Sequence, residues 1–253
     1  MKKINSGNPS RSQHSFRIMA LSLFALISTA SVRAGVLASW DMETNGARTV
    51  ASLVDASVTV TDLAGNNLNT PGSFIGESVV GGAGDDYIAY SRSSGIARTD
   101  AVGAIADSTY FSFTVTPEVG QSITLSSITF DSMAGTGGPS DRQFYLMSDK
   151  TGYLSTEVLA SASTVTGSPL LPYNTSTFDQ NFSADLSGMD FANITDSVTF
   201  RIYIATPNTF QNVGFDDITL NGAVIPEPSS LVLMVLTGFA LVICRRLHLK
   251  ANA

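Results

Sequence analysis

The side chains of this chain that are suited to acid–base or metal chemistry are its carboxylates. The two histidines, His14 and His248, lie near the ends of the sequence, and the single cysteine is Cys244. Residues 35–225 therefore contain neither residue type, which excludes a Ser-His-Asp or Cys-His mechanism within this region. Zinc sites built from these ligands are excluded as well. What remains is a pair of acids acting on a glycosidic bond, or calcium held by oxygen ligands.

A glycine-rich segment carries the first candidate carboxylates, Asp85 and Asp86. Residues 81–89 match one copy of the nonapeptide repeat that binds calcium in β-rolls. In a β-roll the ligands come from stacked neighbouring repeats, and this chain has no second copy. The competing interpretation is a glycine turn with solvated aspartates. Both residues stay tentative ligands for a calcium site of another kind.

A second pair of candidate carboxylates, Asp216 and Asp217, lies in a predicted strand beside Phe215 and Ile218. Neighbouring strand residues point to opposite faces of a sheet, so these two carboxylates diverge and do not form an acid–base pair by themselves. We expect one of them either to bond to a loop backbone or to hold a calcium ion across the sheet. Arg201, on a neighbouring predicted strand, is a candidate salt-bridge partner.

Strands must position these residues, because apolar and polar side chains alternate along most of residues 35–222. The alternation slips by one at Ser126-Ser127, which predicts a bulge or a bend between two strands. A turn is expected at residues 118–121 and a single helical turn within 185–194. Strands spaced in this way predict an all-β domain, an antiparallel β-sandwich or jelly roll, over residues 35–222. The predicted strands cover residues 37–42, 57–63, 87–90, 110–115, 123–130, 142–147, 177–182, 198–204 and 213–220.

The predicted domain is acidic and has no cysteine. Residues 35–225 hold 20 Asp and Glu against six Lys and Arg, a net charge of −14. Such a surface repels a phosphate backbone, which argues against a nucleic-acid partner. The region can form no disulfide, so its stability must come from its core, with or without a metal.

Aromatic side chains are the other groups able to contact a ligand, because their faces can stack on sugar rings. Trp40 follows the apolar face of the first strand and is expected in the core. The aromatic residues considered for stacking are Trp40, Tyr87, Tyr90, Tyr145, Tyr153, Tyr173 and Tyr203.

The N-terminal segment has the three parts of a secretory signal peptide. Four basic residues precede an apolar stretch over residues 18–27, and small residues follow as far as Ala34. We place cleavage after Ala34, with Ala30 as the alternative, so that residues 1–34 form the leader. The competing interpretation is an uncut membrane anchor, which the short apolar stretch disfavours.

The end of the chain combines a proline motif, an apolar run and a basic stop. Pro226-Glu227-Pro228 cannot continue a helix or a central strand, because proline lacks an N–H and fixes φ. The uncharged run that follows is short for a bilayer core of ~30 Å, but Arg245-Arg246 can snorkel at its end. We predict a transmembrane helix over residues 229–246 and a cytoplasmic tail over 247–253. A buried core helix is the competing interpretation.

This order of parts resembles the PEP-CTERM sorting signal of exported bacterial proteins. The resemblance implies that Pro226-Glu227-Pro228, within a linker at 223–228, is the recognition motif and that Arg245 and Arg246 are the stop. It further implies that the helix holds the protein in the inner membrane until an exosortase, a membrane transpeptidase with its own nucleophile, processes the chain near the motif. Delivery to the cell surface or the extracellular matrix would follow.

Parts of the preceding domain resemble the uncharacterised β-sandwich domains that often precede such tails. This resemblance implies a jelly-roll architecture similar to carbohydrate-binding or concanavalin-like domains, and it transfers no activity. The segments that carry it are Ala38-Ser39-Trp40-Asp41, Phe113-Thr114-Val115 with Pro117 and Gly120, Phe200-Arg201-Ile202-Tyr203, and Gly214-Phe215-Asp216-Asp217-Ile218.

We therefore expect an exported, non-enzymatic protein of the cell surface or exopolysaccharide matrix, without catalytic residues. Its expected partners are the secretion machinery, the membrane before processing, an exosortase and exopolysaccharide. The first alternative is a carbohydrate-binding module, which requires exposed aromatic residues on a concave face or loop rim. The second is a glycoside-active enzyme, which requires two carboxylates facing each other in a cleft at about 5–9.5 Å.

Overall fold

The computed structural model describes most of the region predicted as the β-sandwich and few residues of the two predicted signals. The predicted calcium ligands Asp85 and Asp86 lie outside the described residues, as do residues 1–32, Glu227, Pro228 and, apart from Gly238, the predicted helix at 229–246. No helix among the described residues is long and apolar enough to span a bilayer. The described residues are 33–42, 49–69, 88–92, 100–134, 141–165, 170–171, 181–208, 211–226 and Gly238.

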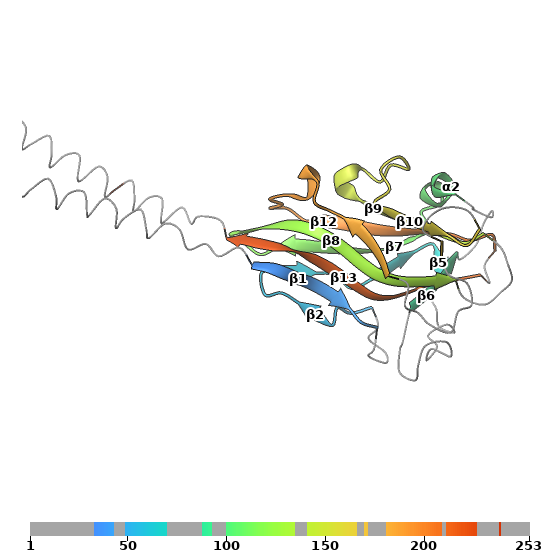
Figure 1. Ribbon diagram of the computed structural model, residues 1–253, viewed down its shortest axis with the longest axis horizontal. Coiled ribbons are helices and arrows are strands. Elements are labelled where there is room, and N and C mark those ends of the chain that lie inside the picture. The colour runs from blue at the N-terminus through green and yellow to red at the C-terminus, as the bar shows by residue number, and fades with distance from the viewer. Residues whose placement is uncertain are drawn as a thin grey trace, which may run out of the picture. The chain divides into compact units, whose positions relative to one another are not determined.

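Two antiparallel sheets pack face to face, which confirms the predicted antiparallel β-sandwich (Figure 1). Within the described residues, one sheet has seven strands in the order β11-β8-β13-β1-β2, with β6 also against β13 and β5 against β6. The other has six strands in the order β10-β9-β12-β7-β3, with β4 also against β7. In chain order the strands are β1 (Arg33–Trp40), β2 (Leu53–Val54), β3 (Val58–Val60), β4 (Ala64–Asn66), β5 (Leu68–Asn69), β6 (Ile88–Arg92), β7 (Tyr110–Pro117), β8 (Gln121–Ala134), β9 (Gln143–Ser148), β10 (Ala160–Ser163), β11 (Asn181–Asp185), β12 (Val198–Ala205) and β13 (Val213–Pro226).

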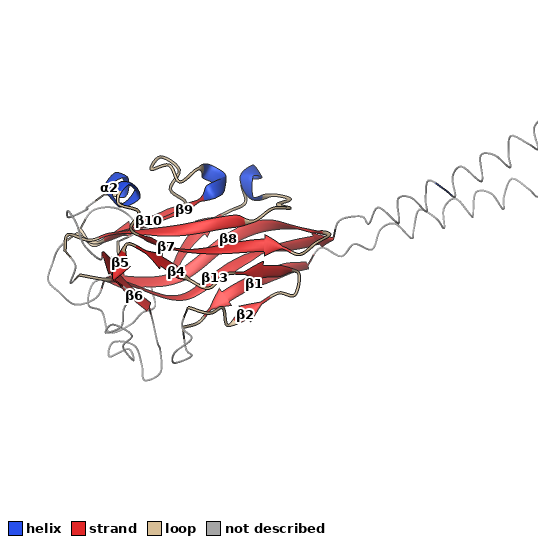
Figure 2. Ribbon diagram, turned by 180° about the vertical axis from the view of Figure 1, so that it is seen from behind, coloured by secondary structure: helices blue, strands red, loops and turns tan. Residues whose placement is uncertain are grey.

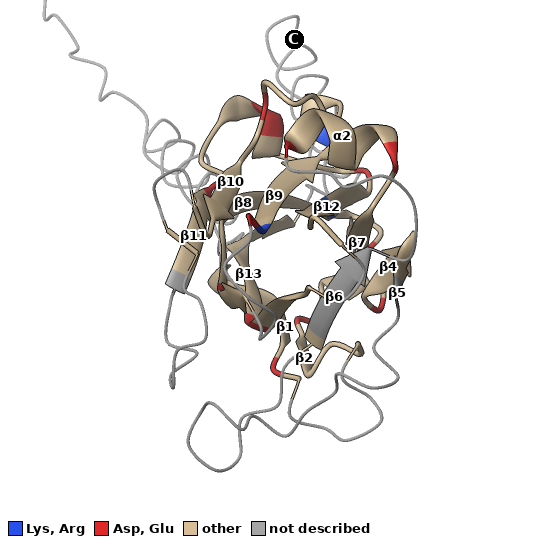
Figure 3. Cartoon of the chain, turned by 90° about the vertical axis from the view of Figure 1, so that its right-hand side faces the viewer, with Lys and Arg blue, Asp and Glu red and all other residues tan. Residues whose placement is uncertain are grey.

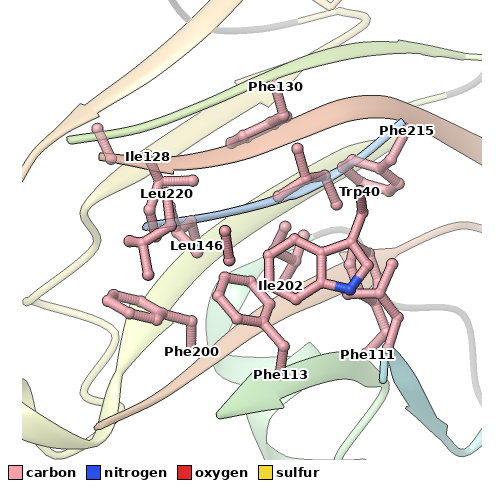
Figure 4. Close-up of a cluster of buried hydrophobic side chains, with 14 of the residues drawn as sticks. Trp40, Phe111, Phe113, Ile128, Phe130, Leu146, Phe200, Ile202, Phe215 and Leu220 are labelled. Atoms are coloured by element: carbon pink, nitrogen blue, oxygen red, sulfur yellow. The ribbon is translucent and has the colours of Figure 1, made fainter. Parts of the chain in front are cut away.

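The core lies between the inner faces of the two sheets and is rich in aromatic rings (Figure 4). Along β7 every second residue is buried, as the alternation predicts. Trp40 from β1 has no exposed surface, and its ring centroid lies 4.6 Å from that of Phe113 on β7. The expected core position of Trp40 is therefore confirmed, and it joins one sheet to the other.

Strand β8 is one continuous strand with a bulge. The slip in the alternation at Ser126-Ser127 therefore marks a bulge and not a bend between two strands. Asn221 of β13 pairs with Ser127, and the next residue of β13 pairs with Leu125, which leaves the exposed Ser126 as the extra residue. Ile128 and Phe130 return to the core after this bulge. The extra residue belongs to β8 alone, so residues on both sides of the bulge face the core although the alternation in the sequence slips by one.

Strand β13 extends beyond the predicted strand end at residue 220. Residues 223–226, which the sequence pattern assigned to a linker, belong to β13 and pair with β8, and residues 223–224 also pair with β1. The Asn221-Gly222 pair, a residue combination common in turns, is an irregular point in the ladder. The pairing of β13 on both sides outweighs the local turn preference of an Asn-Gly pair.

The short helices add little secondary structure but cover one face. Helix α2 (Ala101–Ala106) begins at Asp100, whose side chain accepts a hydrogen bond of 2.7 Å from the Gly103 amide. The 3-10 helix η1 (Asp149–Thr151) follows β9, and η2 (Met189–Phe191) supplies the helical turn expected within 185–194. Both α2 and η1 contact β12 of the six-stranded sheet, and the helices lie together on one side of the sandwich (Figure 2).

Candidate functional site

The first and last strands of the sandwich, which connect to the predicted export and sorting signals, lie next to each other. Ala34, the predicted last residue of the leader, pairs with Ala223, and the pairing of β1 with β13 begins at Arg33 (Figure 1). On the other side of β13 the pairing with β8 continues until Pro226 opposite Gln121. Among the described residues, the first residue of the proline motif is therefore the last residue of β13.

The hydrogen-bond pattern explains why a proline is tolerated at this position. Ile123 exchanges both backbone hydrogen bonds with Ile194, at 2.9 and 2.7 Å, on the side of β8 that faces away from β13. Because backbone groups alternate sides along a strand, Ser122 directs its own groups toward β13 and Gln121 does not. Pro226 lies opposite Gln121 and needs no N–H to complete the ladder there.

A second candidate site lies on the outer face of the six-stranded sheet, where three strands bring tyrosines into one row. Tyr203 of β12 pairs with Tyr110 of β7 on one side and with Tyr145 of β9 on the other. Arg201 lies two residues before Tyr203 on the same face, and Tyr153 reaches the row from the turn after η1. We call these five residues the tyrosine–arginine cluster.

Arg201 is enclosed by aromatic rings within this cluster. Its guanidinium carbon lies 4.3 Å from the ring centroid of Tyr110 and 3.9 Å from that of Tyr153. Its Nη1 also donates a 3.2 Å hydrogen bond to the hydroxyl oxygen of Tyr203. Burial acts to lower the pKa of Arg201, but this hydrogen bond and the neighbouring tyrosines raise it overall, so the side chain stays charged.

The tyrosines at the rim of the cluster are held as neutral phenols. Burial, and next the charge of Asp141, raise the pKa of Tyr145 to about 12. Burial also raises the pKa of Tyr153 to about 12, although Arg201 acts against it. The Tyr145 hydroxyl donates to Gln143, and the Tyr153 hydroxyl donates 3.3 Å to the carbonyl of Thr199.

The ring geometry suits packing better than a flat stacking platform. The rings of Tyr110 and Tyr203 lie 5.2 Å apart at 62°, and those of Tyr153 and Tyr203 lie 6.5 Å apart at 70°. Such edge-to-face contacts stabilise a cluster but do not present coplanar faces to a sugar. Tyr203 itself is 2% exposed, beneath Ala104 of α2 and beside Met147. The cluster therefore acts first as a small second core that holds α2 and the η1 turn on the sheet.

Of the aromatic residues considered for stacking, the structure brings Tyr145, Tyr153 and Tyr203 together. Tyr110 joins them and was missed, although its place on the face opposite Phe111 in an alternating strand was a usable signal. Tyr87 and Tyr173 lie outside the described residues.

The aspartates of the second candidate pair occupy a bulge of β13 and differ in burial. Asp216 is 5% exposed and accepts a 2.8 Å hydrogen bond from the amide of Asp217, which is exposed and has a φ of 47°. In register, Asp216 lies opposite Asp131 of β8, a carboxylate that the sequence interpretation missed. The calcium role of Asp216 and Asp217 stays a prediction. No group of three His, Cys, Asp or Glu side chains suited to a metal occurs within the part of the chain that the structure describes.

The predicted salt bridge of Arg201 with one of Asp216 and Asp217 is wrong, because Arg201 and the two aspartates belong to different sheets. Arg201 lies on β12 of the six-stranded sheet and faces the tyrosines, whereas Asp216 lies on β13 of the seven-stranded sheet. Among the described residues, Asp and Glu positions outnumber Lys and Arg positions (Figure 3). The two predicted strands follow one another in the sequence, but this order did not specify which sheet each would join.

Neither a family model nor a curated protein matches this sequence. Among solved structures, an exo-β-agarase is similar over 77% of this chain and 26% of its own, with 14% identity and a TM-score of 0.35. The Stig cyclase Fisc from Fischerella sp. TAU is similar over 79% of this chain and 91% of its own, with 13% identity and a TM-score of 0.31. Carbohydrate-binding modules from the β-sandwich superfamily match over 65% of this chain and 56% of theirs, with 16% identity and a TM-score of 0.27. These likenesses are too distant to transfer a ligand or an activity.

Proposed function

We propose that this chain is an exported, non-enzymatic β-sandwich protein of jelly-roll type, tethered in the inner membrane by its C-terminal helix and then sorted to the cell surface or exopolysaccharide matrix. The observation that supports this proposal best is the position of the fold's limits. β1 begins at Arg33, so that it includes the last two residues of the predicted leader, and β13 ends at Pro226, the first residue of the proline motif. The first and last strands of the sandwich thus lie within two residues of the two predicted signal boundaries.

In this proposal the exosortase supplies the catalytic group. It breaks one peptide bond near Pro226-Glu227-Pro228, and the anchor segment leaves with the new amino end. The acyl end of the ectodomain passes to the enzyme's nucleophile and then to an acceptor amine or water. The ectodomain contributes the motif and a displayed acidic surface, and it needs no catalytic residue of its own.

The test follows a C-terminal epitope tag on the full chain in an exosortase-bearing host. We expect the wild type to lose the tag and leave the inner membrane. A variant with Glu227→Ala and Pro228→Ala is expected to keep the tag, and it leaves every residue of β13 unchanged. If both proteins stay anchored and full-length alike, the tail is only an anchor and the sorting proposal fails.

Carbohydrate binding is the second candidate, and it is favoured by the half-buried rings of Tyr145 and Tyr153, of which Tyr153 lies against the charged Arg201. These groups combine apolar ring surface with hydrogen-bond donors, as sugar sites do. Because the rings of Tyr153 and Tyr203 lie edge to face, a sugar ring can stack on only one of them at a time. Retention of the protein on exopolysaccharide, lost in Tyr145→Ala without loss of folding, would favour this role.

A further inference from the structure

The methionines are the sulfur-containing side chains of residues 35–225, because cysteine is absent from this region. Oxidants convert an exposed methionine thioether to a sulfoxide, and how fast they do so depends on how far the side chain is exposed. Which sulfurs an oxidant can reach is therefore a property of the fold. The methionines of this region are Met42, Met133, Met147 and Met189.

The fold divides these four methionines into two classes. Met42, Met133 and Met147 are each no more than 2% exposed, whereas Met189 is 93% exposed. Trp40, another side chain that strong oxidants attack, has no exposed surface. Among the methionines of residues 35–225, all of which the structure describes, Met189 alone is open to solvent.

The 3-10 helix η2 turns Met189 outward. Such a helix has about three residues per turn, so Met189 and Phe191 point to different sides of it. Phe191 is 4% exposed, and its ring stacks on that of Phe200 from β12, with centroids 6.1 Å apart at 16°. The Phe191 amide also donates a 3.1 Å hydrogen bond to the Gly188 carbonyl. Phe191 therefore anchors the helix, and Met189 lies on its solvent side.

The consequence of adding an oxygen differs between the two classes. Met147 packs with Tyr203 and Ala104 in the small second core, where a sulfoxide oxygen would be removed from water at a cost in stability. A sulfoxide at Met189 stays in contact with water and leaves the stacking of Phe191 on Phe200 unchanged. Oxidation at Met189 is therefore compatible with the folded domain.

We propose that Met189 is the site at which this domain is oxidised, with a peroxide as the oxidant, and that the fold protects the other three methionines. In the reaction the thioether sulfur attacks one oxygen of the peroxide, the O–O bond breaks, and water leaves. The sulfur loses two electrons and becomes a sulfoxide, while hydrogen peroxide is reduced to water. This inference goes beyond the proposed sorting function and does not depend on it.

Oxidation of the full-length protein, followed at each methionine, tests this proposal. The protein in detergent is treated with hydrogen peroxide, which is uncharged and so is not repelled by the acidic domain. Peptide mass spectrometry measures the gain of one oxygen at each site. We expect Met189 to react at least about tenfold faster than the three buried methionines, because these react only when the structure opens. In urea, which serves as the control, all four should react at similar rates.

Either of two results would overturn the proposal. In the first, Met189 of the folded protein reacts no faster than the buried methionines. In the second, Met189 keeps the same advantage in urea, which would assign its reactivity to the local sequence and not to the fold. Neither result bears on the sorting function, because that function is measured by the loss of the C-terminal tag.

Substitutions identify the reactive sulfur independently. Met189→Leu should take up no oxygen within residues 35–225 during the time in which the wild type takes up one. Met147→Leu, a swap of similar volume in the second core, is the matched control and should be oxidised at Met189 like the wild type. A Met189→Leu protein that is oxidised in this region as fast as the wild type would contradict the proposal.

The stability of the oxidised protein completes the test. Emission from Trp40, the single tryptophan, reports unfolding in urea. We expect the same urea midpoint for the wild type before and after oxidation at Met189, because the added oxygen stays in solvent. A lower midpoint after oxidation would show that Met189 contributes to the fold and would contradict its role as a tolerated oxidation site.

Discussion

Arg201 shows how one residue can join several elements on the outer face of a sheet. Its guanidinium group lies between the rings of Tyr110 from β7 and Tyr153 from the η1 turn, and it bonds to Tyr203 on its own strand. Cation–π contacts of this kind contribute about 0.5–2 kcal/mol each, depending on how far they are removed from water. A partly exposed arginine is therefore part of the domain's stability as well as its surface.

Replacing Arg201 with methionine keeps a long apolar side chain and removes both the charge and the hydrogen-bond donors. We expect the free energy of unfolding to fall by about 1–3 kcal/mol, because two aromatic contacts and one hydrogen bond are lost. Urea titration followed by Trp40 fluorescence measures the change. Arg201→Lys should lie between methionine and wild type, since lysine keeps the charge without the planar group. A methionine variant as stable as wild type would show that the cluster holds without the cation.

The raised pKa values of Tyr145 and Tyr153 predict a loss of stability in alkali. Both pKa values are about 12 in the folded protein, against about 10 in an unfolded chain. The folded state holds these protons more tightly, so its advantage is complete below pH 10 and disappears as pH rises from 10 toward 12. Urea midpoints at pH 8 and pH 11 should differ more in wild type than in the variant Tyr145→Phe with Tyr153→Phe. Equal losses in the two proteins would assign the alkaline sensitivity to other groups.

At the scale of single elements, β8 and β13 depend on close backbone contact at their irregular points. Gly222 lies where β13 resumes its register after the bulge at Ser126. A Cβ atom at Gly222 would lie 2.6 Å from the Thr124 carbonyl oxygen and 2.8 Å from the Leu37 Cδ1 atom. Glycine is needed there because of this close approach, and its position in an Asn-Gly pair does not make it a turn.

The substitution Gly222→Ala should therefore lower the free energy of unfolding by about 1–3 kcal/mol, since the methyl group overpacks against a backbone oxygen. Thermal unfolding followed by circular dichroism measures this loss. Gly35, the cross-strand partner of Gly222, is the matched control, because a Cβ atom there would meet nothing within 4 Å. Gly35→Ala should be neutral or slightly stabilising. Similar losses of stability at both positions would mean that the loss comes from reduced strand flexibility and not from crowding around the added methyl group.

For the whole molecule, the first strand of the sandwich pairs with the last. β1 begins at Arg33 and β13 ends at Pro226, and the two are joined in register. Such long-range pairing closes late in folding, because the entropy of a long loop is lost before the contacts form. The sandwich therefore cannot be complete until the residues next to the sorting motif have arrived.

The strands and the core were predictable because alternation is a local property of the sequence. The buried face of β7, the core position of Trp40 and the slip at Ser126 followed from spacing alone. The absence of histidine and cysteine from residues 35–225 likewise excluded whole classes of mechanism. The resemblance of the last residues to a sorting signal is also a property of the sequence, and it stays a proposal.

Only the tertiary structure decided which strands are neighbours. It placed Tyr110, Tyr203 and Tyr145 in one row, put Arg201 on a different sheet from Asp216, and carried β13 onward to Pro226. The physical reason is that a strand's own pattern specifies which side chains face inward, whereas its partner and register depend on packing among segments far apart in the chain. The sequence alone determined which side chains each strand buries, and the fold determined which residues each of them contacts.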